Sequence, residues 1–277
     1  MIAVTGATGR VGTHLVSLLL ASRERVRVLS RDVERARTSA GEGAEVAYAD
    51  LDEPDSLAPA LDGADRLFLL VPAGPPQLGR ERHAIDAATR AGVRHVVKLS
   101  ALVADDRSPV QLARWHRKAE KELVGSGLAY TILRPPFFMQ NLWAMVSNGT
   151  IRSAAEDGRI AMIDMRDVAA VAATAVTEDG HEGKTYTITG PEAVTFDEVA
   201  MQLSAATGRA ATHVRVAPEV LVRAMTEAGA PEWYSRDMAS LHSLFAAGLE
   251  AATTDVVTTV TGRKPRRLGA FIREHYA

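Results

Sequence analysis

Short apolar runs alternate with amphipathic stretches through the first half of the chain. The apolar runs are rich in β-branched residues and predict strands at residues 1–6, 25–30, 44–50, 65–71, 94–101 and 128–135. Between them, apolar positions recur at helical spacing near residues 10–22, 54–62, 77–91 and 110–126. Apolar strands that alternate with helices predict a parallel sheet covered on both faces, the doubly wound α/β arrangement.

This regular alternation ends after Pro135. Short strands are expected at 159–164 and 184–190, separated by an alanine-rich helix over 165–176. From about residue 190 the pattern is mostly helical, apart from a brief strand near residue 212. The sequence therefore predicts a sheet domain and a smaller, mostly helical C-terminal lobe. The sheet domain is expected to span residues 1–150 plus about 160–190, and the lobe about 140–160 and 190–277.

Composition narrows the class of protein. Hydrophobic residues make up 47% and charged residues 24% of the chain, and the formal net charge is −2, as in ordinary soluble globular proteins. No basic stripe favours a nucleic-acid partner. The absence of cysteine excludes disulfides, thiolate catalysis and cysteine metal sites. Strand-like sequence from Ile2 leaves no room for a signal peptide, and no apolar run approaches a membrane span, so a cytoplasmic protein with no membrane partner is expected.

Three evenly spaced glycines separate the first strand from the first helix. Gly6 allows a sharp turn, Gly9 lets the backbone approach a ligand, and Gly12 lets the new helix pack closely. The helix directs unpaired N–H groups and its positive dipole end at the same space, which suits a pyrophosphate. The spacing differs from the usual G-x-G-x-x-G pattern, but the strand–glycine–helix context predicts dinucleotide binding. The neighbouring residues expected at this site are Thr8, Arg10 and Val11.

Cofactor preference is expected to depend on the end of the second strand. A carboxylate there favours NAD, whereas an arginine favours the 2′-phosphate of NADP. Arg31 offers a planar guanidinium to phosphate oxygens, while Asp32 is more simply an N-cap of the following helix. We therefore expect NADP(H), with NAD(H) as the alternative.

The third and fourth strands end beside the same expected cleft. Asp50 and Leu51 follow the third strand, where the adenine would lie. Val71 and Pro72 end the fourth strand and would line the cleft. Asp52 is expected to cap the helix after Pro54.

Segments spread through essentially the whole chain resemble the NmrA-like group of atypical short-chain dehydrogenase/reductases, with its NAD(P)H:quinone oxidoreductase relatives. The resemblance rests on TGATGRVG (5–12), LSRD (29–32), ADLDEPDSL (49–57), HVVKLSA (95–101), WHRKAEKELVGSGLAYTILRPPFFMQN (115–141) and DMRDVA (164–169). It implies a Rossmann-type cofactor domain, a small lobe and an active cleft between them. The group contains both reductases and cofactor-sensing regulators, so the resemblance alone does not decide between catalysis and sensing.

The tyrosine and lysine, four residues apart, that are typical of short-chain dehydrogenases are replaced here by His116 and Glu120. The resemblance implies a lysine at the position of His116 in isoflavone-reductase-like and NmrA-like relatives, and a quinone-reductase branch that tolerates a histidine there. Residues one helical turn apart face the same way, and a carboxylate favours imidazolium. His116 is therefore expected to be a proton donor supported by Glu120, although a surface helix with paired charges would show the same spacing. No third ligand has suitable spacing, so no metal site is expected.

Further candidates lie at the ends of the fifth and sixth strands. The resemblance places the Ser100 hydroxyl near a substrate carbonyl. Lys98 shares the face of Ser100 and is interpreted as a sheet-end lysine beside an acidic helix. Pro135 ends the sixth strand, and the backbone of Phe137 is expected to meet the nicotinamide carboxamide. The remaining candidates for the substrate cleft are Phe138, Asn141, Trp143 and, from the lobe, Tyr234.

Two functions follow from these features. The first is NADPH-dependent reduction of a quinone or a conjugated carbonyl compound, with hydride transfer from the nicotinamide and a proton from His116. The second is a non-catalytic NADP(H)-binding redox sensor that contacts a protein partner, and it rests on the missing tyrosine–lysine pair. The first is favoured.

Overall fold

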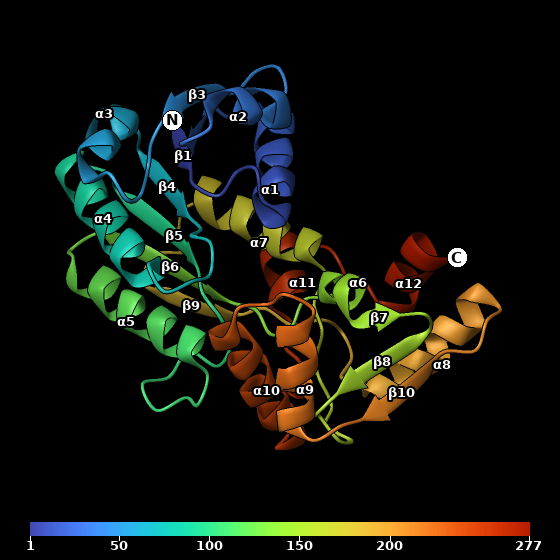
Figure 1. The fold of residues 1–277 in the computed structure, drawn as a ribbon. Helices are drawn as coiled ribbons and strands as arrows, with labels where there is room; N and C mark the ends of the chain where they lie inside the picture. Colours follow the sequence, from blue (N-terminus) through green and yellow to red (C-terminus); the bar gives the residue numbers. More distant parts are fainter.

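The computed structural model describes all 277 residues and contains one large parallel sheet (Figure 1). Neighbouring strands pair in parallel throughout this seven-stranded sheet. The predicted doubly wound α/β fold is therefore confirmed. In spatial order the strands are β3 (Glu45–Tyr48), β2 (Val26–Ser30), β1 (Ile2–Val4), β4 (Arg66–Leu69), β5 (His95–Leu99), β6 (Ala129–Arg134) and β9 (Lys184–Thr187).

Apolar side chains on both faces of the strands explain why helices cover both faces. Phe68 and Val97 pack into one apolar cluster, whereas Leu67 and Val96 pack into the other. The first cluster is completed by α1 (Arg10–Ala21), α2 (Val33–Ala40), α7 (Met165–Thr177) and α11 (Val256–Thr261). The second is completed by α3 (Leu57–Leu61), α4 (Gln77–Arg90) and α5 (Gln111–Gly125), with the short 3₁₀ helix η1 (Pro54–Ser56) before α3. No helix combines the length and apolarity that crossing a membrane would require.

A small second sheet lies among the later helices, beyond one end of the large sheet (Figure 1). β8 (Thr150–Ser153) pairs in parallel with β10 (Thr212–Arg215) and antiparallel with β7 (Val146–Ser147). Around it lie η2 (Met139–Asn141), α6 (Leu142–Met145), α8 (Phe196–Thr207), α9 (Pro218–Glu227), α10 (Glu232–Ala246) and α12 (Leu268–Tyr276). The prediction from sequence included β10 but missed β7 and β8, and its strand at 159–164 is wrong. That segment forms only isolated bridges, Phe138 with Ile163 and Ile160 with Val194, so it has no continuous ladder. The division into two domains stays a prediction.

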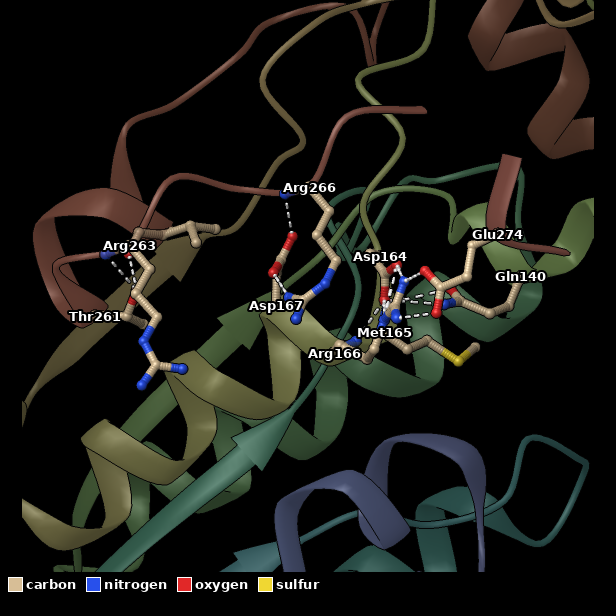
Figure 2. A network of polar contacts seen from close by, with 10 residues as sticks. Gln140, Asp164, Met165, Arg166, Asp167, Thr261, Arg263, Arg266 and Glu274 are labelled. Atoms are coloured by element: carbon tan, nitrogen blue, oxygen red, sulfur yellow. Dashed lines mark hydrogen bonds and ion pairs between the residues drawn. The ribbon is translucent and has the colours of Figure 1, made fainter. Parts of the chain in front are cut away.

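Charged contacts tie the end of the chain to α7 (Figure 2). Asp164 caps this helix by accepting from the Arg166 N–H at 2.8 Å, and the Arg166 guanidinium bridges Asp164 and Glu274 of α12. The Asp167 carboxylate accepts from the backbone N–H of Arg266 at 2.7 Å and from its guanidinium. These contacts connect the last helices with the helix that covers the centre of the large sheet.

Candidate active site

The glycine-rich loop brings three backbone segments into close contact. Gly6 has a φ of +65°, and a Cβ at this position would lie 2.8 Å from the Leu70 side chain. A Cβ on Gly12 would lie 2.2 Å from the Gly6 carbonyl oxygen. α1 begins at Arg10 with Gly9 as its N-cap, and no side chain caps its first N–H groups. The first N–H groups of α1 therefore have no side-chain partner at the positive end of the helix dipole, as a pyrophosphate-binding helix start requires.

A cavity of about 340 Å³ lies beside this loop at the carboxyl ends of β1 to β4. Several predicted cofactor residues line it: Gly6, Thr8, Arg31, Asp50, Leu51 and Pro72. Gly9, Arg10, Val11 and Gly12 are not among its lining residues. Val11 packs in the core, and the Arg10 guanidinium lies over the Trp143 ring at 4.8 Å from the ring centroid.

Two further arginines line this first cavity and were missed by the sequence analysis. Arg35 lies in α2, four residues after Arg31, and Arg80 comes from α4. Arg80 is neutralised by Asp52, whose carboxylate oxygens are 2.8 and 2.5 Å from it. The expectation that Asp52 caps the next helix is therefore wrong, because its carboxylate is engaged by Arg80. Asp32 does cap α2, since its Oδ1 accepts from the Arg35 N–H at 3.0 Å.

A second cavity, of about 350 Å³, adjoins the first and shares Leu70 and Pro72 with it. It opens at the ends of β4, β5 and β6 beneath α5 and α10, and most of its lining is hydrophobic. Its lining includes most of the predicted catalytic and substrate residues, and also Val71 and Pro135, which were predicted to contact the cofactor. The predicted catalytic and substrate residues among them are Ser100, His116, Phe137, Phe138, Asn141 and Tyr234.

Trp143 does not line this second cavity. Its side chain is 42% exposed and stacks on Phe271 of α12 at a ring-centroid distance of 6.0 Å. The lobe instead contributes Asp237, Leu241 and Glu250, which the sequence analysis missed. No local motif marks these three residues, because the packing of α10 against α5 places Asp237 and Leu241, and the turn after α10 places Glu250 beside Phe137.

Glu120 does not support His116, and this expectation is wrong. The Glu120 side chain is fully buried and accepts from Arg134 of β6, with 2.8 Å from Arg134 Nε to Oε1, and from Arg117. Ser100 Oγ donates to Glu120 Oε1 at 2.6 Å. The Ser100 proton is therefore already engaged, which argues against its expected contact with a substrate carbonyl. A guanidinium from the neighbouring strand attracts the carboxylate more strongly than a histidine on the same helix.

His116 instead contacts a different group, the buried ion pair of Lys98 and Glu81. Lys98 Nζ lies 3.2 Å from His116 Nδ1 and donates to Glu81 Oε1 at 2.7 Å. Both side chains of the pair are essentially inaccessible to water. Lys98 is therefore not an ordinary sheet-end lysine, because its ammonium is buried and paired with a buried carboxylate. Burial and the Lys98 charge lower the pKa of His116 well below its usual value. The imidazole is therefore neutral near pH 7, not the imidazolium that the sequence suggested.

The backbone of Phe137 is already hydrogen-bonded within the protein. Its N–H donates to Glu250 Oε2 at 3.2 Å, and its carbonyl accepts from the Ile163 N–H at 3.1 Å. The N–H is therefore engaged, whereas the carbonyl oxygen keeps a second lone pair, so the expected contact with a nicotinamide carboxamide stays a prediction for the carbonyl alone. Glu250 is 2% exposed and has no cationic partner, and burial raises its pKa to about 7.

Comparisons with known proteins agree with this architecture. The chain is 38% identical over 281 residues to an NAD(P)H azoreductase of Xenophilus azovorans, covering 100% of this chain and 98% of that protein. The structure matches the NADPH-dependent quinone oxidoreductase of Escherichia coli in complex with NADPH, with a TM-score of 0.93 and 29% identity over 100% of both chains. It also matches a triphenylmethane reductase of Citrobacter sp. in complex with NADP(H), with a TM-score of 0.88 and 29% identity over 99% of both chains.

The family comparison covers nearly the whole chain. The model of the NmrA-like family matches residues 1–272. The resemblance inferred from the sequence motifs is thereby confirmed, and the chain belongs to the NmrA-like family.

Proposed function

We propose that this protein is an NADPH-dependent reductase of quinones or related conjugated small molecules. The observation that carries the proposal is the pair of adjoining cavities at the carboxyl ends of the parallel strands. One is lined by arginines beside a glycine-rich helix start, and the other is apolar and contains His116. Ligands of open parallel sheets bind at this edge. The named activities of the azoreductase and quinone oxidoreductase relatives support the same reaction class.

The first cavity suits the adenosine and phosphate end of NADPH. The N–H groups at the start of α1 would receive the pyrophosphate, and Arg31 and Arg35 would receive the 2′-phosphate. Leu70 and Pro72 line both cavities, so NADPH would extend past them and place its nicotinamide end in the second cavity. When bound, the nicotinamide supplies a hydride to the substrate.

The second cavity suits a flat, largely apolar acceptor. Phe138 and Tyr234 offer ring faces and edges, and Asn141 adds a polar group. His116, as a neutral imidazole, can donate one N–H to an oxygen or nitrogen of the substrate, where negative charge develops during reduction. Metal ions are not required in this scheme.

Turnover tests the proposal directly. Purified protein is mixed with NADPH and a panel of quinones, conjugated enones and azo dyes, and the loss of NADPH absorbance is followed. Consumption above the uncatalysed rate is expected with at least one class of acceptor. Binding of NADPH and NADP⁺ with different affinity but without turnover would instead favour the redox-sensor alternative.

Replacing His116 with phenylalanine is expected to lower kcat by about 10²-fold, because the cavity loses its neutral hydrogen-bond donor. The dissociation constant for NADPH, measured by fluorescence titration, should change less than kcat, because the phosphate-binding residues line the first cavity, which His116 does not reach. Trp143→Phe is the matched control and should leave kcat within about twofold, since Trp143 lies outside the second cavity. Equal losses in the two variants would contradict the assignment of His116.

Removing the arginines at the end of β2 is expected to reduce the preference for NADPH. Arg31→Ala and Arg35→Ala should each weaken NADPH binding by about tenfold or more and leave NADH binding nearly unchanged, because NADH lacks the 2′-phosphate. Calorimetric titration with both cofactors measures the difference. Arg37→Ala is the control, because Arg37 lies on the same helix, pairs with Glu34 and does not line the cavity. Parallel losses for NADPH and NADH would exclude these side chains from the phosphate.

A further inference from the structure

We infer that Lys98 delivers a proton to His116 Nδ1 while His116 gives its Nε2 proton to the substrate, so that the buried Lys98–Glu81 pair is the proton store of the active site. The inference rests on the proposed function for its substrate. Its structural part, the orientation of the protons between Lys98 and His116, does not.

Three acceptors surround the amine of Lys98. Nζ lies 2.7 Å from Glu81 Oε1, 3.1 Å from the Leu99 carbonyl oxygen and 3.2 Å from His116 Nδ1. An ammonium has three N–H donors and no acceptor. One donor therefore points at each neighbour, and the third is directed at the imidazole nitrogen. A lysine serving only as the structural partner of Glu81 would not need that contact.

The neighbours of His116 also fix its tautomer. Besides Lys98, the Gln77 side-chain nitrogen lies 3.1 Å from Nδ1 and 3.4 Å from Nε2. The same amide nitrogen lies 3.5 Å from Glu81 Oε1, which favours this orientation because the opposite one would turn the amide oxygen toward the carboxylate. The Gln77 nitrogen is near both ring nitrogens, so the Lys98 ammonium, which can only donate, decides: Nδ1 accepts from it and the ring proton resides on Nε2, while the nearest carboxylate oxygen, Glu81 Oε1, lies 3.8 Å from Nδ1.

A neutral imidazole cannot release its single proton on its own, because an imidazolate would remain. Proton transfer from Nε2 therefore requires a proton to arrive at Nδ1. In the coupled step, the substrate oxygen bonds the Nε2 proton as the substrate gains a hydride, and one Nζ–H bond of Lys98 breaks as Nδ1–H forms. Lys98 is left as a neutral amine beside the Glu81 carboxylate. After product release, a proton from water adds to Nε2 and the Nδ1 proton returns to Lys98.

Other charged groups near the cavity are already engaged. Glu120 is held by Arg134, Arg117 and Ser100. From the lobe, Asp237 accepts from the N–H groups of Gln111 and Leu112 at 2.8 and 2.7 Å.

The remaining titratable groups that line the second cavity do not compete for this role. Tyr234 and Glu250 line it and burial raises the pKa of both, but neither is hydrogen-bonded to His116, whose side-chain partners are Lys98 and Gln77. Glu81 is also buried, and desolvation raises its pKa, although Lys98 opposes the shift. Lys98 is thus the ionised donor in contact with His116.

Paired substrates separate proton delivery from hydride uptake. Reduction of a quinone adds a hydride and a proton, whereas a cationic triarylmethane dye becomes neutral by gaining a hydride alone. Two double variants are compared with the wild type in single-turnover experiments at saturating NADPH. Glu81→Gln/Lys98→Gln keeps an N–H donor near Nδ1 but carries no proton to give, and Glu81→Met/Lys98→Met removes both. Each variant replaces both partners, so no unpaired buried charge remains.

Both double variants are expected to lower the ratio of the quinone rate to the dye rate by at least about tenfold. An unchanged ratio in the glutamine variant would overturn proton delivery by Lys98. If the dye is not reduced, the quinone rate relative to that of the wild type decides, with the NADPH dissociation constant and the melting temperature as controls. If the protein reduces no quinone, the proposed function is contradicted. The positions of the protons on His116 are then still decided by NMR, which needs no turnover.

Nitrogen-15 NMR of the histidine rings reads those positions without turnover. In the cofactor-free wild type at pH 7, the His116 signal, assigned by its loss in His116→Phe, should show a protonated Nε2 and an unprotonated Nδ1. The glutamine variant should keep this pattern. The methionine variant should lose it in part, and His116 should titrate at higher pH in both variants, because each lacks the Lys98 charge that lowers the pKa of His116. A wild-type ring that carries its proton on Nδ1 would overturn the inference.

Discussion

Replacing Gly12 with alanine is expected to lower the free energy of unfolding by about 3 kcal/mol and to weaken NADPH binding at least about tenfold. The new Cβ would lie 2.2 Å from the Gly6 carbonyl oxygen and 2.7 Å from Ala7 Cα. Both atoms belong to the backbone, so no flexible side chain can move aside. Either α1 must shift away from the loop or the loop must change shape, and both disturb the N–H groups that would receive the pyrophosphate.

Gly79 provides the matched control for this substitution. It lies within α4, and a Cβ there would meet no atom within 4 Å. Gly79→Ala should therefore raise the free energy of unfolding by about 0.5–1 kcal/mol, because alanine restricts the unfolded chain and favours helix. Urea unfolding followed by circular dichroism gives both values, and fluorescence titration gives the NADPH affinity. Similar changes in the two variants would show that the contact between Gly12 and Gly6 carries no special role.

The sequence predicts the large sheet and the cofactor loop well because their determinants are local. Alternating apolar strands and helices specify a covered parallel sheet without knowledge of any long-range contact. The positive φ of Gly6 is a property of the turn itself, and Gly12 meets Gly6 and Ala7 within a few residues along the chain. Asp32 caps α2 for the same reason, since its partner is the N–H of Arg35.

The partners of the active-site groups were not predictable in the same way. Helical spacing shows that His116 and Glu120 share a face, but not which strand lies beneath it. Glu120 is bound by Arg134 from β6, and His116 by Lys98 from β5. Since α5 packs over both strands, each side chain meets a different cation, and the expected imidazolium becomes a neutral ring. Packing across elements also explains why Glu250 was missed, because it lies 113 residues from its hydrogen-bond donor Phe137.

Glu250 is expected to make the protein less stable as the pH rises from about 4.5 to about 7. Burial without a cation raises the pKa of its carboxyl from 4.5 to about 7, so the folded protein binds the proton more tightly than the unfolded chain. Between these values the folded state holds more protons, and the free energy of unfolding therefore falls as pH rises. The total contribution is about 3 kcal/mol, complete above pH 7 and absent below pH 4.5.

Glu250→Gln should remove this pH dependence, because the amide stays neutral and its oxygen can still accept from the Phe137 N–H. Relative to the wild type, the variant should gain stability steadily from pH 5 to pH 8 in urea unfolding. Glu274→Gln is the control of opposite sign. Arg166 lowers the pKa of Glu274, so its stabilising effect exists at neutral pH and disappears as pH falls. A stability difference between Glu250→Gln and the wild type that does not vary with pH would mean that the Glu250 carboxyl titrates as it does in the unfolded chain, and that the second cavity admits enough water to solvate it.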